Sequence, residues 1–437
     1  MTVSATIGPQ ALISAMLAGF SDLRDLRKGR NKQYRVEDAL MSAFSLFFMQ
    51  SSSFLQYQRQ MATKKGRSNA KSLFGIEQIP CDNQIRSLLD PVAASAVCSG
   101  FESLHQCLES NGKRHPYKCF EQGYLVALDG TEYFSSQEVH CPQCSQRHHR
   151  NGRVSYFHQV VTPVMVKPGC NQVLNLAPEF IRPQDGHDKQ DCETTAAKRW
   201  IEAHPIADTD VGVTLLGDDL YSRQPMCQTA LEHGYGFIFV CLPTSHEELY
   251  EWLEYLEKAG EMNRHQVCRY QGAKPLLYQF RYVNRVPLNA QQPALEVNWC
   301  EVTVIDKRKN KQVYFNTFVT QHLITHETIE AIVEAGRSRW KVENENNNVL
   351  KTKGYHLEHN FGHGQEHLAE LLVTLNLLAF LMHTILELLG GTYGQLRELL
   401  VTRKDFFRDL FTLTRYFWFA SWDALFDFML TEGANST

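Results

Sequence analysis

The sequence predicts an α/β protein in which a β-rich insertion interrupts a mixed sheet and helices occupy both ends of the chain. Two observations predict this class. Between residues 123 and 243, short apolar runs of strand length alternate with helical patterns, and four further strand-like runs follow this part. A chain of 437 residues is long enough for two or three domains with a sizeable core. We therefore expect an α/β core in two parts.

The N-terminal segment, residues 1–122, has the pattern of several short helices. Apolar residues recur at helical spacing over 36–62, and two shorter helices are predicted at 80–92 and 93–110. Basic connections between these helices favour a DNA-binding domain. A plain helical scaffold explains them equally well, because no helix-turn-helix pattern is present.

Residues 123–243 contain the first part of the predicted core. Its runs follow the order strand, strand, strand, helix, strand, helix, strand, which is that of a ribonuclease-H-like mixed sheet. In that fold the first and fourth strands lie side by side. The first strand ends at Asp129 and the fourth at Asp218, so a strand spacing of about 4.8 Å would bring the two carboxylates together. Asp219 is the competing choice at the second position.

The remaining segments complete this architecture. Residues 244–323 predict one helix and four strands with charged hairpins, which form the β-rich insertion. Residues 324–390 return to helical patterns and form the second part of the core. Residues 391–437 predict two more amphipathic helices, and we interpret their many aromatic side chains as packing residues.

A third carboxylate, Glu343, follows Arg339 by four residues, so the two share one face of the predicted helix. Arg339 could orient Glu343 or hold a phosphate near it. An ordinary ion pair on a solvated helix explains this pair alone. It does not explain the asparagines that follow, which are poor helix formers. Those asparagines lie at positions 344, 346, 347 and 348.

Three short motifs resemble the acidic signatures of DDE transposases of bacterial insertion sequences. They are Asp129-Gly130-Thr131, Asp218-x-x-Tyr221 and Arg339-Trp340-x-Val342-Glu343. The closest branch carries a β-strand insertion between its second Asp and its Glu, and the likeness covers about residues 123–365. The last signature departs from the branch pattern at two places. Gly336 stands where a Tyr is usual, and Lys351 lies one residue beyond the usual Lys position.

The resemblance implies a cytoplasmic bacterial enzyme that cleaves DNA strands at insertion-sequence ends and transfers them to target DNA. Asp129, Asp218 and Glu343 would bind two Mg²⁺ or Mn²⁺ ions, since clustered carboxylates repel one another and oxygen ligands suit these cations. The protein would act as a homodimer on double-stranded DNA. Contacts to DNA are expected from Arg339, Trp340, Lys351 and Lys353. A nuclease without strand transfer and a catalytically silent DNA-binding protein remain alternatives.

A separate metal site is predicted in the segment 140–158. Cys141-x-x-Cys144 followed by His148 and His149 has spacing suited to a structural Zn²⁺ ion. Adjacent histidines seldom both bind one ion, so the fourth ligand stays open. The candidates for that ligand are His140, His158, Cys119 and Cys192. Histidines in 355–367 could form a second metal site, contact DNA or simply pack, and helix capping explains most of the acidic segment 185–193, including Glu193.

Composition and charge are compatible with these expectations. The net charge is −4, yet basic residues concentrate in short runs that could share one face. These runs are 24–35, 59–67, 147–153, 306–311 and 337–341. The sequence shows no secretory signal, and polar residues interrupt its most apolar run, 371–389, which predicts a buried helix rather than a membrane span. The twelve cysteines therefore indicate reduced thiols in a cytosol.

Overall fold

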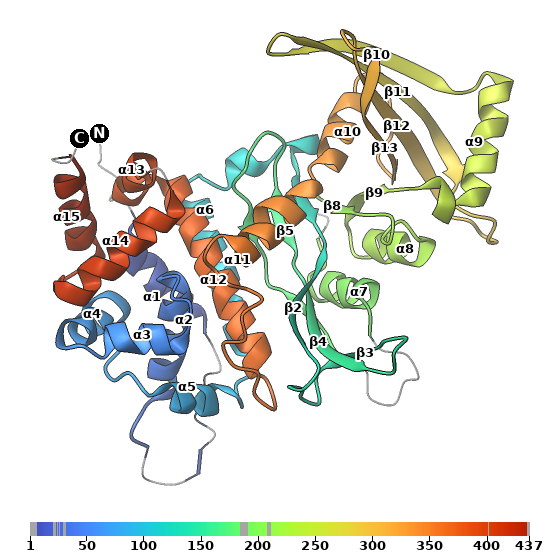
Figure 1. Cartoon of the computed structure of the whole chain (residues 1–437). Coiled ribbons are helices and arrows are strands. Elements are labelled where there is room, and N and C mark those ends of the chain that lie inside the picture. The colour runs from blue at the N-terminus through green and yellow to red at the C-terminus, as the bar shows by residue number, and fades with distance from the viewer. Residues whose placement is uncertain are drawn as a thin grey trace.

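The computed structural model describes residues 7–20, 23, 25, 27–28, 32–183, 191–207, 211–400 and 402–434. A large mixed sheet forms one half of the molecule, and helices from both ends of the chain form the other half (Figure 1). The α/β class is therefore confirmed.

The large sheet has nine strands in the order β10-β11-β12-β13-β9-β8-β1-β5-β6. Strands β1 and β8 are parallel neighbours, and β8 and β9 are parallel, whereas β5 and β6 are antiparallel additions on the other side of β1. The expected pairing of the strands that precede Asp129 and Asp218 is thus present. The central strands are β1 (Tyr124–Ala127), β5 (Val164–Val166), β6 (Leu174–Asn175), β8 (Val213–Gly217) and β9 (Gly236–Val240).

The β-rich insertion continues this sheet instead of forming a separate one. Its last strand pairs antiparallel with β9, and its four strands form successive hairpins. They are β10 (Asn263–Gln271), β11 (Lys274–Pro287), β12 (Glu296–Asp306) and β13 (Lys311–Thr320), and helix α9 (Glu247–Ala259) precedes them. The four expected strands are therefore confirmed.

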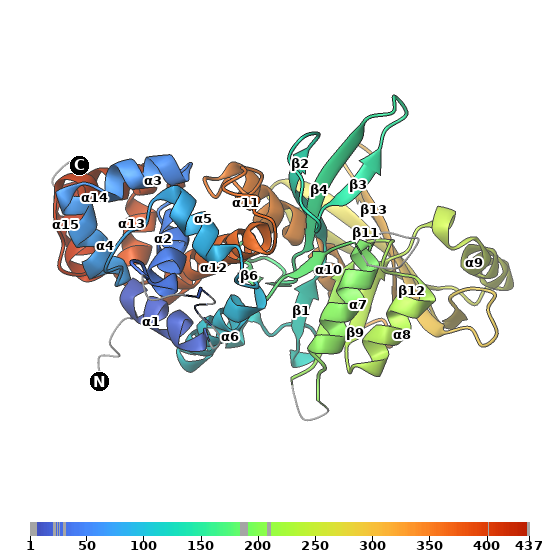
Figure 2. The same cartoon turned by 90° about the horizontal axis from the view of Figure 1, so that it is seen from below.

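The sheet separates two hydrophobic cores because successive side chains of a strand point to opposite faces. In β8, Leu215 belongs to one core and Leu216 to the other, and Phe318 and Val319 of β13 divide in the same way. Helices α7 (Glu193–Ala203) and α8 (Gln224–Glu232) cover one face, as Figure 2 shows. Helix α10 (Ile329–Arg337) packs against the other face through residues such as Ile332.

The expected strands at 155–166 and 172–183 are each broken into two pieces, and the first expected strand is followed by a further strand that the sequence pattern did not indicate. The chain continues past Asp129 from β1 into β2 (Gly130–Ser136), and Pro163 separates β4 (Val154–Val161) from β5. The outer pieces build a small second sheet with β3 (Ser145–His148) and β7 (Glu179–Ile181). Asp129 therefore lies at the bend between two sheets rather than at the end of a strand.

Helices from both chain ends form one helical body with a shared core. Trp422 of the last helix donates a hydrogen bond from its indole N–H to the carbonyl of Leu73, and Gln60 donates to Thr414. The expected helical run 36–62 is two helices, and the Ser53 side chain caps the second one. The helices are α1 (Pro9–Gly19), α2 (Val36–Phe48), α3 (Phe54–Met61), α4 (Lys64–Phe74), α5 (Asp82–Leu89), α6 (Ser95–Ser110), α13 (Gly391–Leu399), α14 (Arg403–Tyr416) and α15 (Trp422–Ala434).

Helix α12 (Leu368–Leu389) joins the helical body to the sheet half and packs against α2 and α6. Among the described residues it alone is long and apolar enough, by length and composition, to cross a membrane. Within the protein 89% of its apolar window is buried, as in the core helix of a soluble protein. The prediction of a buried helix at 371–389 is therefore confirmed.

Candidate functional site

Asp129 lies where β1 passes into β2, beside the end of β8. The backbone of this bend is held on both sides, because Leu128 N–H donates to the carbonyl of Leu216 and Thr162 N–H donates to the carbonyl of Asp129, both at 2.9 Å. The Asp129 carboxylate accepts a hydrogen bond of 2.7 Å from the side-chain amide of Asn347. Its position is thus defined by the sheet and by a residue 218 positions later in the chain.

Asp218 directly follows β8, and its carboxylate also accepts a hydrogen bond from Leu220 N–H at 2.9 Å. The competing residue Asp219 has a structural role instead. One of its oxygens accepts from Leu242 N–H at 2.7 Å and from the Ser245 hydroxyl at 2.6 Å, which fixes the loop after β9. Of this pair, Asp218 is the one whose charge acts on Asp129.

Glu343 lies in the π-helical turn η4 (Val342–Asn347) that follows α10. Such turns interrupt α-helices and frequently occur at functional sites. The turn exposes Glu343, which pairs with Arg339 at 2.5 Å, and it buries Asn346 and Asn347. The asparagine-rich run therefore has a structural reason, since its buried amides turn toward the sheet.

These buried amides form a chain of hydrogen bonds that ends at Asp129. Asn175 of β6 donates to Asn346 at 2.7 Å, and Asn346 donates to Asn347 at 2.9 Å. Asn347 also accepts a hydrogen bond of 3.1 Å from the Thr162 hydroxyl before donating to Asp129. The chain links the turn that carries Glu343 to the bend that carries Asp129.

A fourth carboxylate, Glu193, joins this group, although its sequence context indicated only helix capping. Glu193 is the first residue of α7 and accepts a hydrogen bond of 2.8 Å from the buried hydroxyl of Tyr221. A Cβ on Gly130 would lie 2.3 Å from a carboxylate oxygen of Glu193. Gly130 and Tyr221, which belong to the two Asp motifs, therefore hold Glu193 in place. A buried tyrosine hydroxyl needs a hydrogen-bond acceptor, so Tyr221 was the signal in the sequence that could have indicated a further acid.

The electrostatics of the site show that the acids act on one another. Burial raises the pKa of Asp129 to about 7, and the nearby charges of Glu193, Glu343 and Asp218 add to this shift. Burial likewise raises the pKa of Glu193, and Asp218 contributes. We call Asp129, Glu193, Asp218 and Glu343 the acid cluster. Within this cluster, Asp129 is the carboxylate that is not fully ionised at neutral pH.

The carboxylate oxygens of the acid cluster are nevertheless too far apart to bind one cation together. In the part of the chain that the structure describes, the one group of at least three Asp, Glu, His or Cys side chains with ligand atoms within 4.8 Å of one another lies elsewhere. Arg339 holds the Glu343 carboxylate, whose side chain is 48% exposed. The acids would therefore have to move closer together to share one cation.

The expected DNA contacts occupy different environments. Trp340 is 42% exposed and lines a cavity of about 320 Å³ with Arg269 and Arg337. Lys351 pairs with Glu358 at 2.9 Å, whereas Lys353 is exposed beside a larger cavity of about 780 Å³. That cavity is also lined by three basic residues of α14. They are Arg403, Lys404 and Arg408.

The compact group of ligand atoms is formed by Cys141, Cys144, His158 and His363, which we call the Cys/His cluster. All four residues are buried, and the group could bind a metal such as zinc. The expected pair of cysteines is present. A thiolate is favoured at Cys141, whose pKa is lowered by hydrogen bonds from Cys144 and His158.

The expected ligands His148 and His149 are not part of this cluster, which corrects the sequence interpretation. His148 is exposed on β3, and the His149 ring forms a hydrogen bond of 2.7 Å with Ser155. Strand β4 instead brings in His158, one of the candidates for the fourth ligand, and the segment before α12 brings in His363. Asp185, His187 and Asp188 lie outside the described residues.

Neither the scan against protein-family models nor the search of curated proteins found a match to this chain.

Proposed function

We propose that this chain is a DDE transposase that cuts DNA strands at insertion-sequence ends and joins them to target DNA, with Asp129, Asp218 and Glu343 as its catalytic carboxylates. The observation that carries the proposal is the parallel pairing of β1 with β8, which brings Asp129 and Asp218 to the same edge of the sheet. The raised pKa of Asp129, to which the charges of the other acids contribute, supports it. Carboxylates that far apart in sequence converge at a cost in repulsion, which a cation site would offset.

The arrangement of the core strands supports the same proposal. The order β6-β5-β1-β8-β9, with β1 and β8 parallel, is the order expected for a ribonuclease-H-like sheet. The insertion between Asp218 and Glu343 continues this sheet at its β9 edge. Both features agree with the motif resemblance, which rests on Asp129, Asp218 and Glu343 in that order.

The donor set suits Mg²⁺ or Mn²⁺, because it consists of carboxylate oxygens alone. Two such ions, when bound, would activate water or a DNA 3′-hydroxyl and stabilise the departing oxygen of an in-line displacement. Asn347 would hold the Asp129 carboxylate in place. Glu343 would leave Arg339 to join the other acids, and Arg339 would then be free to contact a DNA phosphate.

The proposal includes a DNA-binding surface and a dimer. Trp340 is exposed and could stack on a base, while Lys353 lies beside the basic cavity next to α14. Lys351 would first have to exchange Glu358 for a phosphate. A homodimer in the bacterial cytosol is proposed because two element ends must be joined together.

The test uses labelled DNA that carries the sequences flanking the reading frame, with Mn²⁺ or Mg²⁺. We expect cut and joined products that require the cation and fall by at least about a thousandfold in Asp129→Asn and Glu343→Gln. Glu345→Gln is the matched comparison, because Glu345 lies on the same turn and matches the third acidic signature less well than Glu343 does. Full activity of folded Glu343→Gln would overturn the assignment.

The same gel separates the proposed function from its alternatives. Cut products that are never joined would indicate a ribonuclease-H-like nuclease. A shifted band without any chemistry would indicate a silent DNA-binding protein. Binding in each case should weaken steeply with salt, because phosphate contacts dominate the affinity.

A further inference from the structure

We infer that Cys141, Cys144, His158 and His363 bind one structural Zn²⁺ ion that fastens the segment after the Glu343 turn to the small sheet after Asp129. This inference concerns a site separate from the acid cluster and does not depend on the proposed function. Its ligands come from three places, the β2–β3 connection, β4 and the segment before α12.

Four of the six distances among the ligand atoms match those of a tetrahedral zinc site, and all six lie within 4.8 Å. With Zn–S bonds of about 2.3 Å and Zn–N bonds of about 2.05 Å, tetrahedral geometry requires S···S of about 3.8 Å and S···N of about 3.6 Å. The two sulfurs, of Cys141 and Cys144, lie 3.9 Å apart. The S···N distances to the Nε2 atom of His158 are 3.5 and 3.4 Å, and Cys144 Sγ lies 3.4 Å from Nε2 of His363.

The surroundings hold these ligands in place. Cys141 N–H points at Cys144 Sγ at 3.4 Å, and Cys144 N–H donates to the carbonyl of Cys141, which closes the turn between the cysteines. The His158 ring stacks on Tyr133 with centroids 5.6 Å apart, and Phe134 packs against His363 at 4.3 Å. Support of this kind around the ligands orients them before the ion binds.

The ligand set indicates a structural rather than a catalytic ion. Two thiolates and two imidazoles complete a tetrahedron, so no position remains for water or substrate. All four side chains are at least 91% buried, and the sulfurs are much farther apart than the roughly 2.05 Å of a disulfide. Soft sulfur and imidazole ligands favour zinc over the Mg²⁺ or Mn²⁺ that suits the acid cluster.

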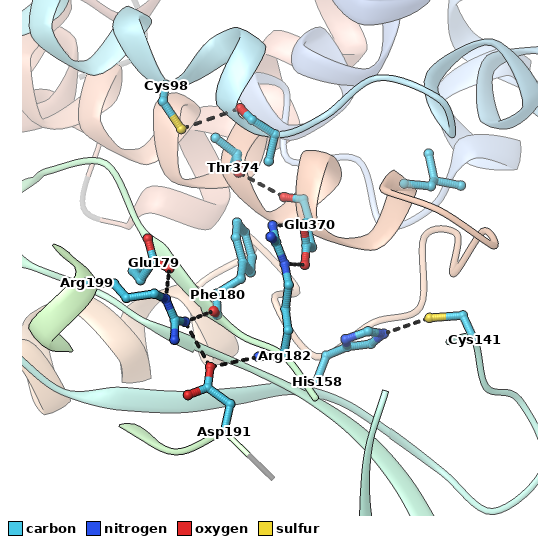
Figure 3. A network of polar contacts seen from close by, with 12 residues as sticks. Cys98, Cys141, His158, Glu179, Phe180, Arg182, Asp191, Arg199, Glu370 and Thr374 are labelled. Atoms are coloured by element: carbon cyan, nitrogen blue, oxygen red, sulfur yellow. Dashed lines mark hydrogen bonds and ion pairs between the residues drawn. The ribbon is translucent and has the colours of Figure 1, made fainter. Parts of the chain in front are cut away.

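The proposed ion would join two parts of the chain that also meet at the acid cluster. Near the acids, Asn347 bonds to Asp129 and Thr162, which lie at the inner ends of β2 and β4. Farther along the same strands, the cluster connects β4 to His363. A third link lies close by, where Arg182 forms two hydrogen bonds of 2.6 Å with the buried carboxylate of Glu370 in α12 (Figure 3).

Figure 3 shows the His158 ring directed at Cys141, below the Arg182–Glu370 pair. Together with the proposed ion, these contacts would attach the small sheet to the second part of the core at three points within the described residues. Of these three links, the proposed ion is the one with a ligand in segment 353–367, which has little regular structure. Asp90, Arg86 and Asn376 also hold this segment through hydrogen bonds, but to the helical body and α12. We expect this attachment to fix the segment that connects the Glu343 turn to α12.

The first test measures the metal content of the full chain. The protein is purified without added metal and is then dialysed. We expect about one zinc ion per chain, and Cys144→Ser and His363→Ala should lower that content by at least about tenfold. His148→Ala/His149→Ala is the matched control and should keep its zinc. Zinc-free wild-type protein, or zinc lost from the control and kept by His363→Ala, would overturn the site.

A second variant distinguishes the loss of a metal ligand from the loss of folding. His363→Cys keeps a zinc-binding side chain at this position, so it should retain the metal that His363→Ala loses. After exchange of zinc for Co²⁺, the wild type should show the intense visible bands of tetrahedral cobalt, and His363→Cys should show stronger thiolate-to-cobalt absorption. An unchanged spectrum in that variant would exclude His363 as a ligand.

Hydrogen exchange tests the attachment itself. Amide exchange in segment 353–367 should become faster in His363→Ala than in the wild type, and His359→Ala, an exposed neighbour in the same segment, should not change it. Equal exchange rates in the wild type and both variants would show that the ion does not hold the segment. Metal content and exchange are measured without DNA, so their failure is distinct from a failure of the proposed function.

Discussion

The Cys/His cluster and the acid cluster have converged to different degrees. In the Cys/His cluster the four ligand atoms lie within 4.8 Å of one another. In the acid cluster Glu343 is held by Arg339 and Glu193 by Tyr221, and the pKa of Asp129 is raised to about 7. The ligand atoms of the first group are close enough to share one metal ion. The carboxylates of the second group are not, and two of them are paired with Arg339 and Tyr221.

This difference has a physical cause. Thiols and imidazoles can be neutral without a metal, so they can be buried together at modest cost. Carboxylates repel one another when ionised, and burial raises that cost. A folded chain without a cation therefore tolerates a closed Cys/His cluster but only an open acid cluster. Removing a ligand should then have opposite effects on stability in the two places.

The largest effect on stability is expected for Cys144→Ser. The variant should lower the free energy of unfolding by about 4 kcal/mol, because it removes the metal and leaves buried ligands without it. Thermal unfolding with and without a chelator measures this loss. A chelator should destabilise the wild type and have little further effect on the variant. If Cys144→Ser were as stable as the metal-loaded wild type, the Cys/His cluster would not stabilise the fold, and the expected difference in stability between the two clusters would be wrong.

An effect of opposite sign is expected for Asp129→Asn. The folded-state pKa of Asp129 is raised from 3.8 to about 7, so the folded chain binds more protons than the unfolded chain between these pH values. Stability contributed by this group is therefore present below about pH 4 and is lost as pH rises toward 7. Asparagine removes the charge, so at pH 8 without divalent cations the variant should gain about 1–3 kcal/mol.

The pH dependence provides the control for this prediction. Below about pH 3, where the wild-type carboxyl is protonated in both the folded and the unfolded state, the gain should vanish. Mn²⁺ should raise the unfolding temperature of the wild type more at pH 8 than at pH 6, because protons compete for Asp129, and should have little effect on Asp129→Asn. A destabilised variant at pH 8 would show that the acids are not in conflict.

Parts of this architecture could be predicted from the sequence because they depend on residues that are close together in the chain. Apolar runs predicted β1, β8, β9 and the four strands of the insertion, and the Cys-x-x-Cys spacing predicted two of the four compact ligands. The break of two strands between two sheets and the additional strand β2 were not visible, since Asp129-Gly130 looks like an ordinary strand end. Its cause lies in contacts with distant residues such as Asn347.

The two site residues that the sequence interpretation missed share one property. His363 lies 219 residues from Cys144, and Glu193 lies 28 residues from the Tyr221 hydroxyl that holds it. No spacing rule connects residues over such distances. Local spacing favoured His148 and His149 because they are near in sequence, but β3 carries His148 away from the cysteines. The strand pairing of β2 with β4 places His158 opposite Phe134 instead.

A smaller effect is expected for Glu193→Gln, which tests whether the fourth acid belongs to the site. After burial, the charge of Glu193 has the largest effect among those that raise the pKa of Asp129. Without that charge the pKa should fall by about one unit, so stabilisation by Mn²⁺ should persist to lower pH. Glu202→Gln, an exposed position on the same helix, is the control. A pH dependence identical to the wild type would place Glu193 outside the cluster.

The smallest effect, again of opposite sign, is expected for Asn347→Ala. The Asn347 amide donates to the Asp129 carboxylate at 2.7 Å and so favours its ionised form. Without this hydrogen bond the pKa of Asp129 should rise further, and Mn²⁺ should stabilise the variant only at higher pH, by a few tenths of a unit. Asn348→Ala, at an exposed neighbouring position, should leave the pH dependence unchanged. If both variants shift it equally, the turn acts through its backbone and not through the amide. If Asn347→Ala alone raises the pH at which Mn²⁺ begins to stabilise the protein and Glu193→Gln lowers it, both effects are explained by the pKa of Asp129. The Asn347 amide then lowers that pKa, and the Glu193 charge raises it.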